Sequence, residues 1–318
     1  MAGDIHDWNS KLILLKAETT EGTDSVPALA ADALKVRNFV PTFLDADQKT
    51  RTLEKAFFGA DPVGLSNLRR GATFDMDWAG GGVAAGTTIP PWMKVLAFCG
   101  FGAPLAGANS VTQSPRTSGI PSASFYYYID DLRVIALGTR GGVGFTFQDD
   151  EYPIFSVNLL GAPPASLIDQ VTPPAVAPTG YVDPLIASTE VSTFMFDGYA
   201  YPLRSWTMSD NAQLSQRSLI NPKDRTKYGG RSWSGNLVVR VPDLGVANPF
   251  TKIRTGATGA ATAVHGTTSG NIVQAAAQGL QITGAPTLSN EDGETMATIP
   301  VTALPSATGN DEIVFTSK

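Results

Sequence analysis

The stretch Arg69-Arg70-Gly71-Ala72-Thr73-Phe74-Asp75-Met76-Asp77-Trp78 decides the fold class. From Ala72 onward, apolar side chains alternate with polar ones, so the two aromatic residues and Met76 share one face. Asp75 and Asp77 lie on the opposite face. A period of two is typical of a β-strand that is buried on one side only. We therefore predict a strand over 72–78 with an acidic, outward-facing side.

Strand patterns recur along the rest of the chain, and helical patterns are confined to two short segments. Further strands are predicted at 124–129, 132–137, 142–147, 153–160, 232–241, 271–277, 280–288 and 294–304. Pro90–Gly100 has apolar residues three and four apart, with proline at its start and glycine at its end. Asn248–Gly256 combines an Asn cap, Pro at the first helical position and Gly after the end. The chain is predicted to be mainly β, with two short α-helices.

The order of these elements occurs twice. Each half has a basic and glycine-containing strand start, then a short helix, then a meander with an acidic turn, at 148–151 and at 290–293. Between the halves, 161–190 contains six prolines, a density that favours an extended connection. We predict a first domain at 1–160, a connector at 161–190 and a second domain at 191–318. The alternative to a duplication is a chance likeness, which any all-β chain can produce.

Composition restricts the function. Only 16% of the 318 residues are charged, against roughly 25% in an average domain, and the formal net charge is −6. An acidic chain is a poor candidate for gripping nucleic acid through its phosphates. The first residues offer no signal-peptide pattern, and the most apolar stretch, 92–108, is interrupted by Lys94, Gly100, Gly102 and Pro104. We expect synthesis in the cytoplasm and no membrane partner.

Residues for catalysis or metal binding are sparse. The two histidines, His6 and His265, have no carboxylate or cysteine neighbours at the spacing of metal ligands, and Cys99 is the only cysteine. No nucleophile-elbow motif occurs. The acidic turns lack the spacing of a calcium loop, so solvated hairpin turns are the favoured interpretation. We expect no enzymatic activity, no catalytic or metal site and no cofactor.

Two long stretches carry much of the charge of both signs. They are Asp45–Leu68 and Ser209–Tyr228, and each precedes the strand start of its half. Loops of this length are uncommon in compact domains unless they have a function. A solvated loop is the alternative; a surface that contacts another protein is our prediction. Its representative residues are Arg51, Glu54, Lys55, Arg217 and Arg225.

The order of short motifs resembles that of the tail tube (major tail) proteins of long-tailed bacteriophages. The motifs are Lys16-Ala17-Glu18-Thr19-Thr20-Glu21-Gly22-Thr23, Arg69-Arg70-Gly71, Ala79-Gly80, Pro91-Trp92 and Cys99-Gly100. The likeness covers residues 11–160 best. It is carried by the order of the motifs, since none of them is diagnostic alone.

This resemblance implies two tandem tail-tube-like β-sandwich or β-barrel domains, each with one short flanking helix. Such proteins form rings that stack into a hollow virion tube, assembled in the host cytoplasm, through which genomic DNA passes without specific binding. The implied partners are further copies of the chain, the tape measure protein and the tail-end proteins. Asp75 and Asp77 are the candidates for the lumen face. With two domains per chain, three chains are expected to close a pseudo-hexameric ring; six chains per ring is the alternative.

A function of a different class is also compatible with the sequence. A carbohydrate-binding or adhesive β-sandwich module of a phage tail would use exposed aromatic side chains as a sugar platform. Tyr126, Tyr128, Trp206 and Trp233 are the candidates for it.

Overall fold

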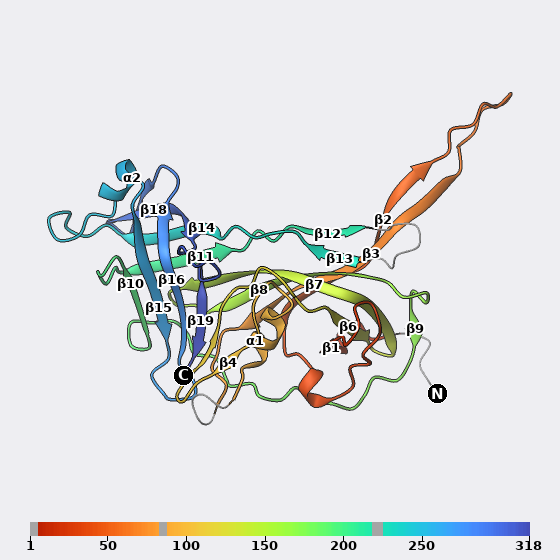
Figure 1. Cartoon of the computed structure of the whole chain (residues 1–318), viewed down its shortest axis with the longest axis horizontal. Coiled ribbons are helices and arrows are strands. Elements are labelled where there is room, and N and C mark those ends of the chain that lie inside the picture. Colours follow the sequence, from red (N-terminus) through yellow and green to blue (C-terminus); the bar gives the residue numbers. More distant parts are fainter. Residues whose placement is uncertain (1–5, 83–87, 218–224) are drawn as a thin grey trace.

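A computed structural model describes residues 6–82, 88–217 and 225–318, with 48% of the residues in strands and 5% in helices (Figure 1). The prediction of a mainly β chain with two short helices is confirmed. The elements are β1 (Lys11–Ala17), the 3-10 helix η1 (Ala30–Asp32), β2 (Arg37–Thr50), β3 (Val63–Asp77), α1 (Pro91–Leu96), β4 (Leu105–Ala106), β5 (Val111–Gln113), β6 (Ala123–Ile129), β7 (Leu132–Gln148), β8 (Ile154–Ala162), β9 (Asp169–Gln170), β10 (Ser192–Phe196), β11 (Leu203–Ser209), β12 (Leu214–Arg217), β13 (Arg225–Tyr228), β14 (Ser234–Arg240), α2 (Thr251–Thr255), β15 (Thr258–His265), β16 (Val273–Ile282), β17 (Thr287–Glu291), β18 (Glu294–Leu304) and β19 (Val314–Ser317).

The alternating pattern of the opening stretch has the predicted consequence. Phe74, Met76 and Trp78 are buried, whereas Asp75 and Asp77 are partly exposed on the other side of β3. The strand begins nine residues earlier than predicted, at Val63, because it pairs with β2 over nearly its whole length.

A continuous path of antiparallel strands forms the centre of the molecule. Its order is β2-β3-β8-β7-β11-β14-β18-β17, each neighbour hydrogen-bonded to the next. The core lies on one face of this path. There Trp92 of α1 stacks on Phe155 with 4.8 Å between ring centroids, and Phe315 of β19 lies 5.0 Å from Phe155. Because β19 is the last strand, residues from both halves of the chain share this core.

The two halves also share one order of strand pairs. In the first half β1 pairs with β6, β2 with β3, β3 with β8, β6 with β7 and β7 with β8. In the second half the corresponding pairs are β10–β15, β11–β14, β14–β18, β15–β16 and β16–β18. All ten pairs are antiparallel, and α1 and α2 follow the corresponding strands β3 and β14. The halves meet where β7 pairs with β11.

One predicted strand break is absent and another is displaced. Residues 132–137 and 142–147 belong to the single strand β7, which has a register shift between Leu137 and Arg140. The glycines there serve close packing: a Cβ on Gly141 would lie 2.8 Å from the Sγ atom of Cys99. In the second half, β16 runs through residue 278, and the break falls at 283–286 instead.

The charged stretches form hairpins rather than loops. β2 and β3 extend as a long two-stranded arm that projects from the body, and β12 pairs with β13 beside the base of that arm (Figure 1). Opposite charges on neighbouring strands favour the pairing: Arg69 on β3 contacts Asp45 at 2.6 Å and Asp47 at 2.9 Å on β2. Some of the mixed charge in this stretch therefore forms ion pairs between the two strands of the arm.

The proline-rich stretch 161–190 contains the end of β8 and the two-residue strand β9, and otherwise no helix or strand. Hydrogen bonds hold it to the body at several points. The Tyr181 hydroxyl accepts a hydrogen bond of 2.9 Å from the backbone N–H of Lys35, and the backbone N–H of Val171 donates to the carbonyl of Asp131.

Candidate functional surfaces

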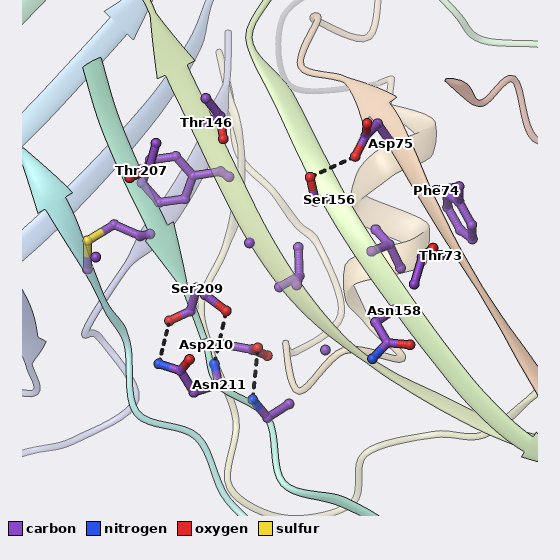
Figure 2. Close-up of a pocket in the computed structure, with 18 of the residues that line it drawn as sticks. Thr73, Phe74, Asp75, Thr146, Ser156, Asn158, Thr207, Ser209, Asp210 and Asn211 are labelled. Atoms are coloured by element: carbon purple, nitrogen blue, oxygen red, sulfur yellow. Dashed lines mark hydrogen bonds between the residues drawn. The ribbon is translucent and has the colours of Figure 1, made fainter. Parts of the chain in front are cut away.

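The face of the central strands opposite to the core is covered by small polar side chains. They come from six neighbouring strands, β3, β8, β7, β11, β14 and β18. Figure 2 shows those of β3, β8, β7 and β11. The outward residues are Thr73, Asp75, Asp77, Ile154, Ser156, Asn158, Gly142, Gly144, Thr146, Gln148, Ser205, Thr207, Ser209, Ser234, Asn236, Val238, Thr298, Pro300 and Thr302. No lysine or arginine is among them, but two arginines border the set: Arg240 follows Val238 on the same side of β14, and Arg37 of β2 lies opposite Asp75. We call this surface the polar face.

A hollow of about 690 Å³ lies on the polar face (Figure 2). Its lining includes Asp75 of β3, Ser156 of β8, Thr146 of β7, Thr207 of β11 and Ser234 of β14, so five of the six strands contribute a hydroxyl or carboxylate to it. Gly142 and Gly144 form its floor on β7. The absence of side chains on these glycines keeps the sheet surface open between the polar rows.

The two lumen-face candidates lie on the polar face, at its β3 end. The Asp75 carboxylate accepts hydrogen bonds from the Ser156 Oγ at 2.7 Å and from the Asn38 Nδ2 at 2.8 Å. Asp77 forms an ion pair with Arg37, with 3.1 Å between Nε and Oδ1. The negative charge of Asp77 is therefore partly offset, and Asp75 carries most of the free negative charge there.

A third carboxylate lies buried below the hollow. Asp210, 2% exposed, follows β11, and its Oδ1 accepts a hydrogen bond of 3.0 Å from the backbone N–H of Ala212. The Tyr228 hydroxyl of β13 donates to its Oδ2 at 3.2 Å. Burial raises the pKa of Asp210 to about 6. Sequence reasoning placed Asp210 among surface charges and missed this burial.

The contact candidate Lys55 lies at the tip of the β2–β3 arm, where its charge is paired within the tip. The Lys55 ammonium contacts the Asp61 carboxylate at 2.5 Å and the Ala60 carbonyl at 2.8 Å, so it closes the tip turn on itself. Two aromatic side chains are also exposed at the tip: Phe57 is 72% exposed and Phe58 is fully exposed. Two adjacent phenylalanines inside a polar stretch were the sequence signal for this surface.

The remaining contact candidates lie on the same two hairpins. Arg51 and Glu54 are exposed near the arm tip, and Arg217 is exposed at the end of β12. Arg217 pairs with Arg225 of β13, whose side chain lies outside the described part of the chain. Whether these residues contact a partner stays a prediction.

Groups that could support catalysis are engaged in the fold. His265 is buried; its Nε2 donates to the Leu185 carbonyl at 3.1 Å and its Nδ1 lies 2.9 Å from the Ser192 hydroxyl. Burial lowers the pKa of His265, which favours the neutral ring. Cys99 is fully buried, and burial raises the pKa of its thiol.

Within the described residues, one group of potential metal ligands occurs, at His6, Asp130 and Asp131 near the surface. None of the helices in this part of the chain has the length and apolar character needed to cross a membrane.

The four aromatic residues predicted to form a sugar platform are buried, so this prediction is wrong for them. Tyr126, Tyr128, Trp206 and Trp233 are at most 4% exposed. Trp206 and Trp233 belong to the aromatic core, and the Tyr126 hydroxyl donates to the carboxylate of Asp24. Because these ring faces are covered by protein, they have no free surface on which a sugar could stack.

One arginine side chain contacts both acidic turns. Arg204 lies 3.1 Å from Glu291 and 3.8 Å from Asp149, which places the turns of both halves at the same end of the sheet. These are exposed ion pairs, as expected for solvated hairpin turns.

Comparison with known proteins adds no assignment: no protein-family model matches the chain, and no curated protein matches its sequence significantly.

Proposed function

We propose that this chain is the structural subunit of a bacteriophage tail tube, in which rings of the chain stack into a conduit for genomic DNA. The observation that carries the proposal is the polar face: six neighbouring strands that carry mostly small uncharged groups and carboxylates. The arginines at its borders, Arg37 and Arg240, are held in ion pairs with Asp77 and Glu294. Duplex DNA carries about one negative charge per 1.7 Å of its axis and binds cations by releasing its counterions. A surface of this composition lets DNA pass without holding it.

The repeated order of strand pairs supports two tube units in each chain. Five antiparallel pairs recur in the second half, and the β7–β11 pairing joins the halves side by side in one sheet. If each half is one tube unit, three chains supply six units around the axis. The ring is then a heterologous cyclic assembly, in which one edge of a chain contacts the opposite edge of the next.

The hairpins give such rings a means of stacking. The β2–β3 arm projects well beyond the body, and its tip exposes Phe57 and Phe58 (Figure 1). Arg51, Glu54 and Lys55 belong to the same tip, and Arg217 and Arg225 to the β12–β13 hairpin. We assign both hairpins to contacts between rings. The tape measure protein and the tail-end proteins are the further partners of the tube.

Electron microscopy of the purified chain, together with native mass spectrometry, tests the assembly. We expect rings of three chains with six similar units, which stack into hollow tubes. Six chains per ring would contradict the two-unit proposal, and a protein that stays monomeric at high concentration would contradict the tube.

Charge reversal tests the conduit. Tubes of an Asp75→Lys, Asp77→Lys variant should retain fluorescent duplex DNA at low salt and release it as salt is raised, whereas native tubes should not retain it. The matched control is Asp183→Lys, Glu190→Lys, which changes net charge equally outside the polar face. Equal retention by both variants would contradict the assignment of the polar face to the lumen.

A further inference from the structure

Inside the chain, the two halves are joined by the pairing of β7 with β11. The two outermost strands of the sheet, in contrast, each have one side without a partner strand among the described residues. β7 is paired on both sides: Thr146 lies opposite Ile154 of β8 and opposite Thr207 of β11. β17, in contrast, pairs only with β18 among the described residues, and all five of its residues are exposed. At the other end of the sheet, β2 pairs only with β3 within the described part of the chain. The two unpaired edges lie at opposite ends of the strand path.

β17 corresponds to the last part of β7. Each precedes the turn of a hairpin, and each turn contains an aspartate with a left-handed backbone, Asp150 at φ 61° and Asp292 at φ 50°. Beyond the turns, the bond from the Trp78 N–H to the Pro153 carbonyl, 2.9 Å, matches that from the Val241 N–H to the Thr295 carbonyl, 3.0 Å.

These matches set the correspondence of single residues on the two hairpins. Ile154 corresponds to Met296, which lies opposite Ser289. Because Ile154 lies opposite Thr146, Ser289 takes the place of Thr146. Two residues further on, Glu291 takes the place of Gln148.

β2 corresponds to β11 by the same argument. Asp75 lies opposite Ser156, and Val238 lies opposite Thr298, which is the counterpart of Ser156. Arg37 is the β2 residue opposite Asp75, and Ser205 is the β11 residue opposite Val238. Arg37 therefore takes the place of Ser205. Both strands also have a register shift next to these residues.

We propose that β17 of one copy pairs antiparallel with β2 of the next copy, with Glu291 opposite Arg37, as Gln148 lies opposite Ser205 within the chain. The joint continues the sheet and its polar face from copy to copy. The pairing places opposite charges across it, which favours this register over a shifted one. It also covers two exposed edges that would otherwise be open to non-specific strand addition. This inference rests on the proposed ring and names the contact that closes it.

The backbone geometry of β17 allows a substitution that blocks the proposed pairing with the next copy and leaves the fold of the chain intact. Glu291 and Glu294 flank the two-residue turn and face each other as a hydrogen-bonded pair, and amides alternate in direction along an antiparallel strand. The N–H of Leu288 therefore points away from β18, to the free edge. Leu288 is 65% exposed, so its side chain contributes little to the core. Proline at this position removes the N–H needed by the neighbour and leaves the β17–β18 pairing in place.

The first test compares Leu288→Pro with the control Leu288→Ala, which loses the same side chain but keeps the N–H. We expect Leu288→Pro to stay monomeric at concentrations at least tenfold above those at which the native chain forms rings. Its far-UV circular dichroism should match that of the native chain. Leu288→Ala should form rings like the native chain. Rings formed equally by both variants would overturn the joint and leave the tube proposal standing; a native chain that never forms rings would overturn both.

A second test does not depend on the proline variant. Gln148 and Ser205 form a non-hydrogen-bonded pair, the type in which opposite Cα atoms approach to about 4.5 Å, within reach of a disulfide. In assembled Arg37→Cys, Glu291→Cys protein, oxidation should link the chains covalently into multimers on a non-reducing gel. The single variants should not link in this way, and Cys99 is too deeply buried to react. Failure of the assembled double variant to cross-link would overturn the proposed register.

Discussion

The two halves of the chain have the same order of strand pairs but different interiors. In the first half, α1 is buried along five of its residues and packs on an aromatic core. In the second half, α2 has no buried residue, and many core positions are alanines: Ala261, Ala263, Ala275, Ala277, Ala297 and Ala303. The pairing order therefore does not require one type of core. Burial of large apolar side chains, the main source of stability, is concentrated in the first half.

The largest expected effect is on the free energy of unfolding, and it should differ between substitutions in α1 and in α2. Trp92→Ala removes a fully packed ring and the hydrogen bond of 2.7 Å from its Nε1 to the Ala79 carbonyl. We expect a loss of about 3–5 kcal/mol in the free energy of unfolding. Ile253→Ala on α2, where the side chain is 39% exposed, should cost less than about 1 kcal/mol. Urea denaturation measures both, and similar losses would show that the halves share stability evenly.

A second difference concerns the charges buried at the bases of the two hairpins. The first half buries Arg70, whose guanidinium donates to the carbonyls of Ile135 and Leu167, and burial lowers its pKa. The second half buries Asp210, with a pKa of about 6 against 3.8 in a model compound. A carboxyl with a raised pKa binds its proton more tightly in the folded state. Its contribution to stability is therefore fully present below pH 3.8 and is lost as the pH rises through 6.

Asp210→Asn should remove this pH dependence. Between pH 4 and pH 7 the native chain should lose roughly 2–3 kcal/mol relative to the variant, since one pKa unit corresponds to about 1.4 kcal/mol. Denaturation curves at a series of pH values measure the difference. Parallel pH profiles for the two proteins would mean that the carboxylate is better solvated than its 2% exposure indicates.

The smallest effect on folding is expected at the arm tip. Phe57→Ser, Phe58→Ser should change the free energy of unfolding by less than about 0.5 kcal/mol, because both rings are already exposed. The same variant should prevent rings from stacking, since burying aromatic rings contributes most of the energy of an interface. Arg217→Ser on the second hairpin should weaken stacking less, because exposed charges contribute little. Sedimentation of assembled tubes compares the two, and normal tubes from the double phenylalanine variant would contradict a role for the tip.

Local patterns were predictable where local chemistry decides the structure. The alternation ending at Trp78 predicted which face of β3 is buried, and Gly256 ends α2 with the left-handed backbone, at φ 65°, expected after a helix. The acidic turns were also placed correctly. The hairpins in the charged stretches were not predicted, because an exposed loop and a projecting hairpin have similar amino-acid compositions.

By itself, the sequence determined the mainly β class, the positions of the helices and turns, and the acidic side of β3, because each depends on residues within a few positions of one another. Only the tertiary structure decided that β7 pairs with β11, that the polar rows of six strands form one face, and that Tyr126 and Trp206 are buried rather than exposed. Those features depend on strands about 55 to 90 residues apart in the sequence. Which strand neighbours which is set by packing of the shared core, and no short pattern in the chain records it.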